Sequence, residues 1–189
     1  MSPTMPDVSP ADARAFIAAN TRLLAPPLVP EVVLHLAEES LPLWQRTEDE
    51  LGQMGLPPPF WAFAWAGGQA LARYVLDHPE IVAGKRVLDL ASGSGLVGIA
   101  ALKAGAHSVL AADIDPFAFT AIGLNAALNG VAIDATAEDL LALPPPPTEV
   151  ILVGDLFYEK GLAARCFAWV KAAQGQGATV LIGDPGRSY

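Results

Sequence analysis

The stretch Val87-Leu88-Asp89-Leu90-Ala91-Ser92-Gly93-Ser94-Gly95 constrains the fold of this chain more than any other. An apolar strand ends in small residues that permit a tight turn, and an apolar run over residues 96–104 follows as a helix. Gly93 and Gly95 let the backbone approach a ligand without a Cβ in the way. A strand, a glycine-rich turn and a helix in this order predict a nucleotide-like ligand at the carboxyl edge of an α/β sheet.

The rest of the chain repeats this alternation of strand and helix. Predicted strands cover residues 87–90, 108–112, 131–136, 150–153 and 178–182. Predicted helices cover residues 67–77, 96–104, 161–173 and the segment from Asp115-Pro116 to Asn129-Gly130. The order implies an α/β, Rossmann-like fold, with a mostly parallel sheet, right-handed crossovers and helices on both faces.

An extension precedes this core. Ser9 is expected to cap a helix from Pro10 to about Leu24, and residues 31–37 alternate as a strand with Val32, Leu34 and Leu36 on one face. Residues 52–59, rich in Gly and Pro, are expected to form a loop. We therefore predict a single domain over residues 1–189, divided into an N-terminal helical and strand extension (1–56) and a Rossmann-like core (57–189).

Composition excludes several classes of protein. A hydrophobic content of 52% with 16% charged residues excludes a disordered chain, and no apolar run approaches the roughly 20 residues of a membrane helix. The net charge of −9, without a basic cluster, disfavours nucleic acid. A positively charged partner is favoured, although the acidic surface could serve solubility alone. The cytoplasm is the expected compartment, and Cys166 is expected to be a buried thiol without a role.

Asp89 separates two interpretations of the glycine turn. Gly93, Gly95 and Gly98 also spell the dinucleotide fingerprint, so the glycines alone do not identify the ligand. A carboxylate at Asp89 would repel a pyrophosphate, whereas it could accept hydrogen bonds from the cationic amino-acid part of S-adenosylmethionine (SAM). We therefore predict SAM as the cofactor in preference to a nicotinamide or flavin dinucleotide, with no metal ion.

Further cofactor-binding residues are expected at the ends of the neighbouring strands. Asp113, at the end of the second core strand, is placed to accept both ribose hydroxyls, and Ile114 follows it. Ala91 and Ser92 complete the turn beside Gly93. After the third core strand, Asp139 is predicted to accept the exocyclic amine of adenine, and the alternative is that residues 138–139 form a solvated loop. Asp115 is expected to be a helix N-cap.

An aromatic segment, Phe60-Trp61-Ala62-Phe63-Ala64-Trp65, precedes the first core helix. We expect Phe60 and Phe63 to pack in the core. Trp65 begins a helix that leads toward the cofactor strand, where its indole could contact the sulfonium as a cation–π partner. Core packing is the alternative for Trp65 as well.

The segment Asp155-Leu156-Phe157-Tyr158 follows the strand over residues 150–153 and is the candidate site of reaction. Asp155 could orient an acceptor amine or help to remove its proton, and Phe157 and Tyr158 could form an aromatic wall that desolvates it. The alternative is that Asp155 caps the following helix and that the aromatic side chains belong to the core.

Several blocks of sequence in one order carry a resemblance to a known family. They are VPE at residues 29–31, LHLA at 34–37, PPFWAFAW at 58–65, GGQALARY at 67–74, DIDP at 113–116, GDLFY at 154–158 and IGDPGR at 182–187. From about Pro27 to Arg187, the chain resembles the electron transfer flavoprotein β-subunit lysine methyltransferases, which belong to the seven-strand class I SAM-dependent protein lysine methyltransferases. The resemblance implies a SAM-dependent lysine N-methyltransferase of the class I fold that acts on the electron transfer flavoprotein β-subunit.

The resemblance also assigns residues. An acidic residue followed three positions later by Tyr or Phe marks the methyl-transfer site, which falls on Asp155 and Tyr158. The acid of the SAM motif falls on Asp89, and its later glycines fall on Gly93 and Gly95. Ala91 stands where the family usually has its first glycine, a departure expected to be tolerable if φ is negative there.

Two alternatives to this function stay open at the level of sequence. Related sequences carry the label of a predicted nicotinamide N-methylase, and both acceptors are nitrogen nucleophiles. A catalytically silent SAM-binding module is the second alternative. The chain ends soon after its fifth core strand, without the antiparallel hairpin that usually completes such a sheet, so either the sequence is truncated or this edge is unusual.

Overall fold

The computed structural model describes residues 9–38 and 58–186, and most of the predicted loop over residues 52–59 lies outside them. At its centre is a parallel sheet in the order β5-β4-β3-β6-β7. The strands are β3 (Arg86–Leu90), β4 (Ser108–Ala112), β5 (Asp134–Thr136), β6 (Val150–Gly154) and β7 (Thr179–Gly183). The strand order reverses between β3 and β6, which is the point where open α/β sheets bind their ligands.

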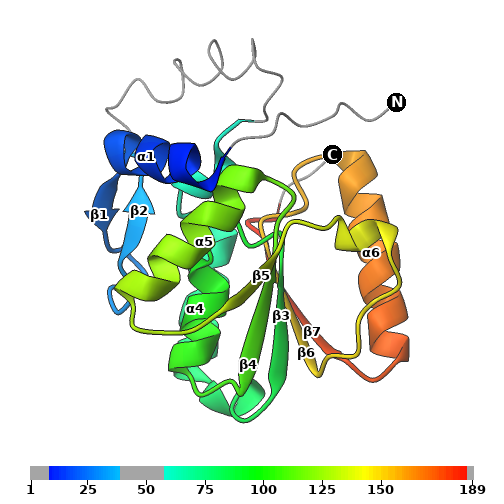
Figure 1. Ribbon diagram of the computed structural model, residues 1–189. Coiled ribbons are helices and arrows are strands. Elements are labelled where there is room, and N and C mark those ends of the chain that lie inside the picture. Colours follow the sequence, from blue (N-terminus) through cyan, green and yellow to red (C-terminus); the bar gives the residue numbers. More distant parts are fainter. Residues whose placement is uncertain (1–8, 39–57, 187–189) are drawn as a thin grey trace.

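Helices cover both faces of the sheet, as predicted (Figure 1). α4 (Leu96–Lys103) and α5 (Pro116–Leu128) lie on one face, where α3 (Ala66–Asp77) packs against α4. α6 (Lys160–Gly175) covers the other face. Short 3₁₀ helices η1 (Phe60–Ala62), η2 (Pro79–Ile81) and η3 (Leu140–Ala142) complete the described core. No helix in residues 9–38 or 58–186 is long and apolar enough to span a bilayer.

The core has one apolar layer on each face of the sheet. In β6, Val150 and Leu152 pack with the residues of α3 and α4, whereas Ile151 and Val153 pack with those of α6. All four side chains are fully buried. Burial on both faces explains why this strand is a continuous apolar run in the sequence instead of an alternating one. β7 is less buried, and within the described residues it pairs with β6 alone.

The N-terminal extension differs from its prediction. Ser9 caps α1 (Pro10–Asn20) as expected, but the helix ends at Asn20 and not near Leu24. Residues 22–24 form β1 (Arg22–Leu24), which pairs antiparallel with β2 (Leu34–Leu36). Pairing with a distant strand therefore overrides the local helical tendency of this segment. The predicted strand over residues 31–37 shortens to β2, while Val32, Leu34 and Leu36 are buried as predicted.

Other predicted boundaries shift by one to three residues. The strand predicted over 131–136 is β5, which begins at Asp134, because pairing with β4 begins there opposite Leu110. Val131 and Ile133, which precede β5, still pack against the core. Cys166 is buried as expected, and burial raises the pKa of its thiol to about 11.

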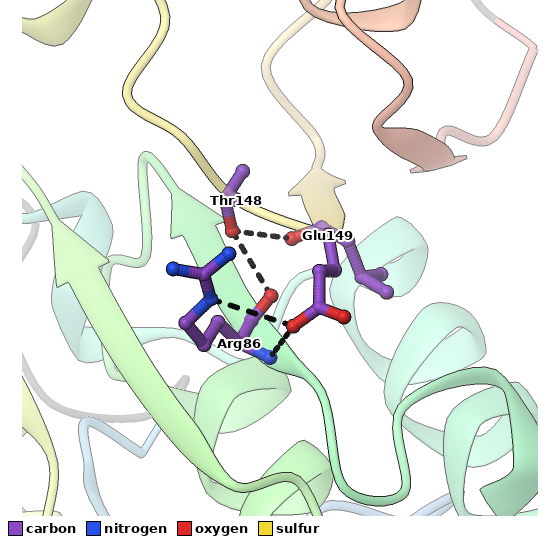
Figure 2. A network of polar contacts seen from close by, with 4 residues as sticks. Arg86, Thr148 and Glu149 are labelled. Carbon is purple, nitrogen blue, oxygen red and sulfur yellow. Dashed lines mark hydrogen bonds and ion pairs between the residues drawn. The ribbon is translucent and has the colours of Figure 1, made fainter.

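A polar network joins the amino ends of β3 and β6 (Figure 2). The Glu149 carboxylate accepts a hydrogen bond from the Arg86 backbone amide at 2.9 Å and pairs with its guanidinium at 3.4 Å. The Thr148 hydroxyl donates to the Arg86 carbonyl oxygen at 3.0 Å. Because these groups are largely exposed, their energetic contribution is small. They fix how the loop before β6 meets β3, at the end of the sheet opposite to the predicted site.

Candidate active site

A cavity of about 500 Å³ lies at the carboxyl ends of the parallel strands, beside the switch point between β3 and β6. Its walls come from the β3–α4 turn, the ends of β4, β5 and β6, and the segment that carries η1 and the start of α3. Its volume is in the range of small-molecule sites. Most residues predicted to bind the cofactor or the acceptor line this cavity, but Gly95 and Phe157 do not. The lining residues among them are Trp65, Asp89, Ala91, Ser92, Gly93, Asp113, Ile114, Asp139, Asp155 and Tyr158.

The turn after β3 has the conformation that its glycines predict. Gly93 has φ +54° and Gly95, the residue before α4, has φ +80°. Both values lie in the left-handed region, which glycine adopts without steric cost. The Ser92 backbone amide donates to the Ala112 carbonyl oxygen at 3.1 Å, and its hydroxyl donates to the Asp89 carbonyl oxygen at 2.9 Å. The turn is thereby held against the end of β4.

Ala91, which stands where the family usually has a glycine, was expected to be tolerable if its φ were negative, and this condition is not met. Its φ is +55°, so an alanine occupies a left-handed position where a glycine would be unstrained. Among the described residues, Asp155 is the other non-glycine with a positive φ, at +54°. Both line the cavity. Backbone strain in this part of the chain is therefore concentrated at the candidate site, as is common at functional sites.

Asp89 is buried in the wall between the cavity and α4. Its Oδ2 accepts a hydrogen bond from the Gly98 backbone amide at 2.8 Å. Burial raises the pKa of this carboxyl to about 7, and the hydrogen bond from Gly98 offsets part of that increase. The nearby charge of Asp113 raises it further. A cationic ligand group would stabilise the ionised form of Asp89.

Asp113 connects the turn to the end of β4. One carboxylate oxygen accepts from the Gly93 amide at 2.8 Å, and the other accepts from the Asp115 amide at 3.0 Å. Burial raises its pKa. Asp115 caps α5 through the Phe117 amide at 2.8 Å, which confirms its predicted role as an N-cap. Ile114, between the two acids, is 59% exposed on the cavity wall.

Asp139 lies on the wall contributed by β5 and η3. Its carboxylate caps η3 through the Leu141 amide at 3.1 Å and forms an ion pair with Arg165 of α6 at 3.0 Å. The pair is exposed, but it holds α6 beside η3 at the edge of the cavity. Residues 138–139 are exposed and lie between β5 and η3, as the alternative of a solvated loop predicts, and adenine recognition by Asp139 stays a prediction. Arg165 was missed because its partner lies 26 positions away in the sequence.

Asp155 is held at the start of α3. Its Oδ2 accepts a hydrogen bond from the Gly68 backbone amide at 2.6 Å, and its own amide donates to the Gly183 carbonyl oxygen at 2.8 Å. Gly67 and Gly183 lack the Cβ atoms that would otherwise collide here with backbone. Glu159, and not Asp155, caps α6. The alternative in which Asp155 caps the following helix is therefore wrong.

The aromatic residues are distributed differently from the prediction. Phe157 packs against the apolar cluster beneath α6 and does not line the cavity, so its predicted place in the aromatic wall is wrong. Phe60, expected in the core, lines the cavity instead. Phe63 also lines the cavity, but it packs against the apolar cluster of α1 and α5 as well, so its expected core packing is confirmed. Trp61 is the aromatic residue of this segment that is fully buried. The alternation of one segment cannot distinguish a core from a cavity wall, because both are apolar.

Tyr158 and Trp65 are half-exposed on the same wall. The Tyr158 ring packs against the Phe60 ring at a centroid distance of 5.4 Å, and burial raises the pKa of its hydroxyl with a contribution from the charge of Asp113. The Trp65 indole N–H donates to the Phe60 carbonyl oxygen at 2.8 Å. This bond was not predictable from the sequence, since it depends on the turn of η1.

Charge on the cavity wall is strongly asymmetric. Within the described residues its lining contains six carboxylates and one basic residue, Arg165, which is already paired with Asp139. The carboxylates are Asp89, Asp113, Asp115, Glu138, Asp139 and Asp155. Such a wall attracts cationic ligand groups and repels phosphates, which favours a sulfonium cofactor over a dinucleotide.

Comparisons with known proteins agree with this geometry. The family "Ribosomal protein L11 methyltransferase (PrmA)" matches residues 69–152. The electron transfer flavoprotein β-subunit lysine methyltransferase of Xenopus laevis is 44% identical over 177 residues, which are 93% of this chain and 71% of that protein. The chain belongs to the family of electron transfer flavoprotein β-subunit lysine methyltransferases. The Homo sapiens member is 40% identical over 93% of this chain and 67% of its own length.

A solved structure extends the agreement to the fold. The ribosomal protein L11 methylase of Lactobacillus delbrueckii subsp. bulgaricus superposes with a TM-score of 0.53 at 30% identity, covering 62% of this chain and 60% of that one. This methyltransferase thus has the α/β, Rossmann-like class I fold that its sequence predicts. The enzyme class is therefore that of a methyltransferase.

Proposed function

We propose that this methyltransferase transfers methyl groups from SAM to lysine side chains of the electron transfer flavoprotein β-subunit. The acidic and aromatic cavity at the switch point is the observation that carries the proposal. One ligand is a sulfonium with an amino-acid ammonium, and the other is a lysine amine, so both bring positive charge to a wall of carboxylates. The names of the relatives support the choice of protein substrate.

The residues present fit the cofactor. The left-handed Gly93 leaves the backbone of the turn open to a ligand, and Asp113 lies beside it with a carboxylate suited to ribose hydroxyls. Asp89 and the turn residues Ala91 and Ser92 would hold the amino-acid part. When bound, SAM would supply an electrophilic methyl carbon, which the lone pair of an amine attacks while the carbon–sulfur bonding pair leaves with the thioether sulfur.

Asp155 and the aromatic wall would prepare the acceptor. Only the neutral amine has the lone pair that forms the new nitrogen–carbon bond, so a lysine must lose a proton before or during transfer. The Asp155 carboxylate attracts the ammonium into the cavity and can accept that proton. Its bond to Gly68 fixes the carboxylate in place. Tyr158 excludes water on one side of the amine, which favours the neutral form.

Transfer of label tests this proposal. The protein is incubated with radiolabelled SAM and purified electron transfer flavoprotein, and in parallel with a lysate of its own cells. A labelled β-subunit whose label maps to lysine is the expected result. Label found only in small molecules would support the nicotinamide-type alternative, and binding of SAM without any transfer would support the silent module. Asp155→Asn is the control, because an amide oxygen can keep the Gly68 bond. The cytoplasmic location stays a prediction, which cell fractionation would test.

A further inference from the structure

We propose that Phe60 and Trp65 position the acceptor, forming with Tyr158 an aromatic wall along which the aliphatic stem of a lysine lies while its amine reaches Asp155. The inference rests on the proposed function, because it takes the acceptor to be a lysine. It also moves Trp65 from the cofactor, where the sequence placed it, to the acceptor.

The rings form one continuous row in the cavity. Ring centroids are 5.7 Å apart between Phe63 and Trp65, 6.0 Å between Trp65 and Phe60, and 5.4 Å between Phe60 and Tyr158. All four residues line the cavity. The row therefore joins two segments distant in sequence, the one that carries η1 and the one that follows β6.

The row is attached to the acceptor side of the cavity through α3. Trp65 is the residue immediately before α3, and Gly68, in the first turn of this helix, donates to the Asp155 carboxylate. Tyr158 follows β6, as Asp155 does. β4 and β6 lie on opposite sides of β3 in the sheet. The candidate contacts to the ribose and the amino-acid part follow β4 and β3, so Asp155 and Tyr158, which follow β6, lie on the other side of the cavity. The wall and the acid thus share a helix start and a strand end.

A lysine side chain matches the chemistry of this wall. Trp65 is 38% exposed and Tyr158 49% exposed, so their faces offer apolar surface that methylene groups can bury. An ammonium near the rings gains cation–π attraction on the way to Asp155. Removal of water along the stem then lowers the pKa of the amine and favours the nucleophilic form.

Steady-state kinetics and calorimetry test the assignment together. The variants are Trp65→Ala, Trp65→Phe and Phe60→Leu, and the control is Phe167→Ala, which removes an aromatic ring that is 55% exposed on α6 outside the cavity. We measure kcat and KM for the electron transfer flavoprotein β-subunit, and the Kd of S-adenosylhomocysteine by calorimetry. Trp65→Ala and Phe60→Leu should raise KM about tenfold, the loss expected for one aromatic contact. The Kd of S-adenosylhomocysteine should stay within twofold of the wild-type value. Trp65→Phe should restore most of the wild-type KM, and Phe167→Ala should match the wild type in both quantities.

Other outcomes overturn the inference. A Kd that rises tenfold with an unchanged KM would place Trp65 on the cofactor, and unchanged kinetics in Trp65→Ala and Phe60→Leu would reduce the row to packing. A normal Kd certifies that a variant is folded, and should Trp65→Ala not fold, Phe60→Leu and Trp65→Phe decide the matter. If the wild type methylates no lysine, the proposed function fails before any variant is compared, and this inference fails with it.

Discussion

Asp89 makes the stability of the ligand-free protein depend on pH in a direction opposite to that of most carboxylates. The pKa of its carboxyl is raised by burial from 3.8 to about 7. The folded state therefore binds more protons than the unfolded state between these values, and stability falls as pH rises through 7. The full difference corresponds to about 4 kcal/mol, of which about 3 kcal/mol falls between pH 5 and pH 8.

Asp89→Asn removes this titration while leaving the shape of the side chain. The asparagine oxygen can still accept from the Gly98 amide, so packing and the hydrogen bond are retained. Between pH 5 and pH 8 the variant should lose about 3 kcal/mol less of its unfolding free energy than the wild type does. It should not become independent of pH, because burial also raises the pKa of Asp115 to about 7.

Urea unfolding at pH 5, 6, 7 and 8, without ligand, provides the measurement. Asp134→Asn is the matched control, because it neutralises an exposed carboxylate on β5. Retention of the full wild-type pH dependence by Asp89→Asn would refute the burial argument. So would a loss of stability at pH 8, since it would mean that the ionised carboxylate is well stabilised in the folded protein.

Three further predictions concern ligands and chemistry. Asp155→Asn should leave the affinity for SAM nearly intact, while the rate of methyl transfer falls 100-fold or more, which is about 2.7 kcal/mol in the activation barrier. Asp113→Ala should instead weaken SAM binding first. Normal turnover of Asp155→Asn would remove this residue from the chemistry. In thermal-shift titrations SAM at 100 times its Kd should add about 2.7 kcal/mol of stability, and stabilisation by NAD instead would overturn the cofactor assignment. With a net charge of −9, kcat/KM for a basic protein substrate should fall as salt rises, and salt-independent kinetics would exclude charge steering.

Much of the fold was predictable because its signals are local. The apolar run of β6 and the turn at Gly93 each specify their own element, and the acids at the ends of three strands could be placed at one edge of the sheet by topology alone. Asp89, Asp113 and Asp155 indeed line one cavity. The end of α1 was not predictable, because residues 22–24 become a strand only through pairing with β2.

The sequence by itself thus determined the order of strands and helices in the core, the family and the acids of the site, since hydrophobic periodicity and strand ends are read within a few residues. Tertiary structure alone decided which side chains share the cavity. It placed Phe60 and not Phe157 beside Tyr158, gave Asp155 the Gly68 amide as a partner, and put Ala91 in a left-handed conformation. The physical reason is that each of these features depends on packing between segments far apart in the chain, which no local pattern encodes.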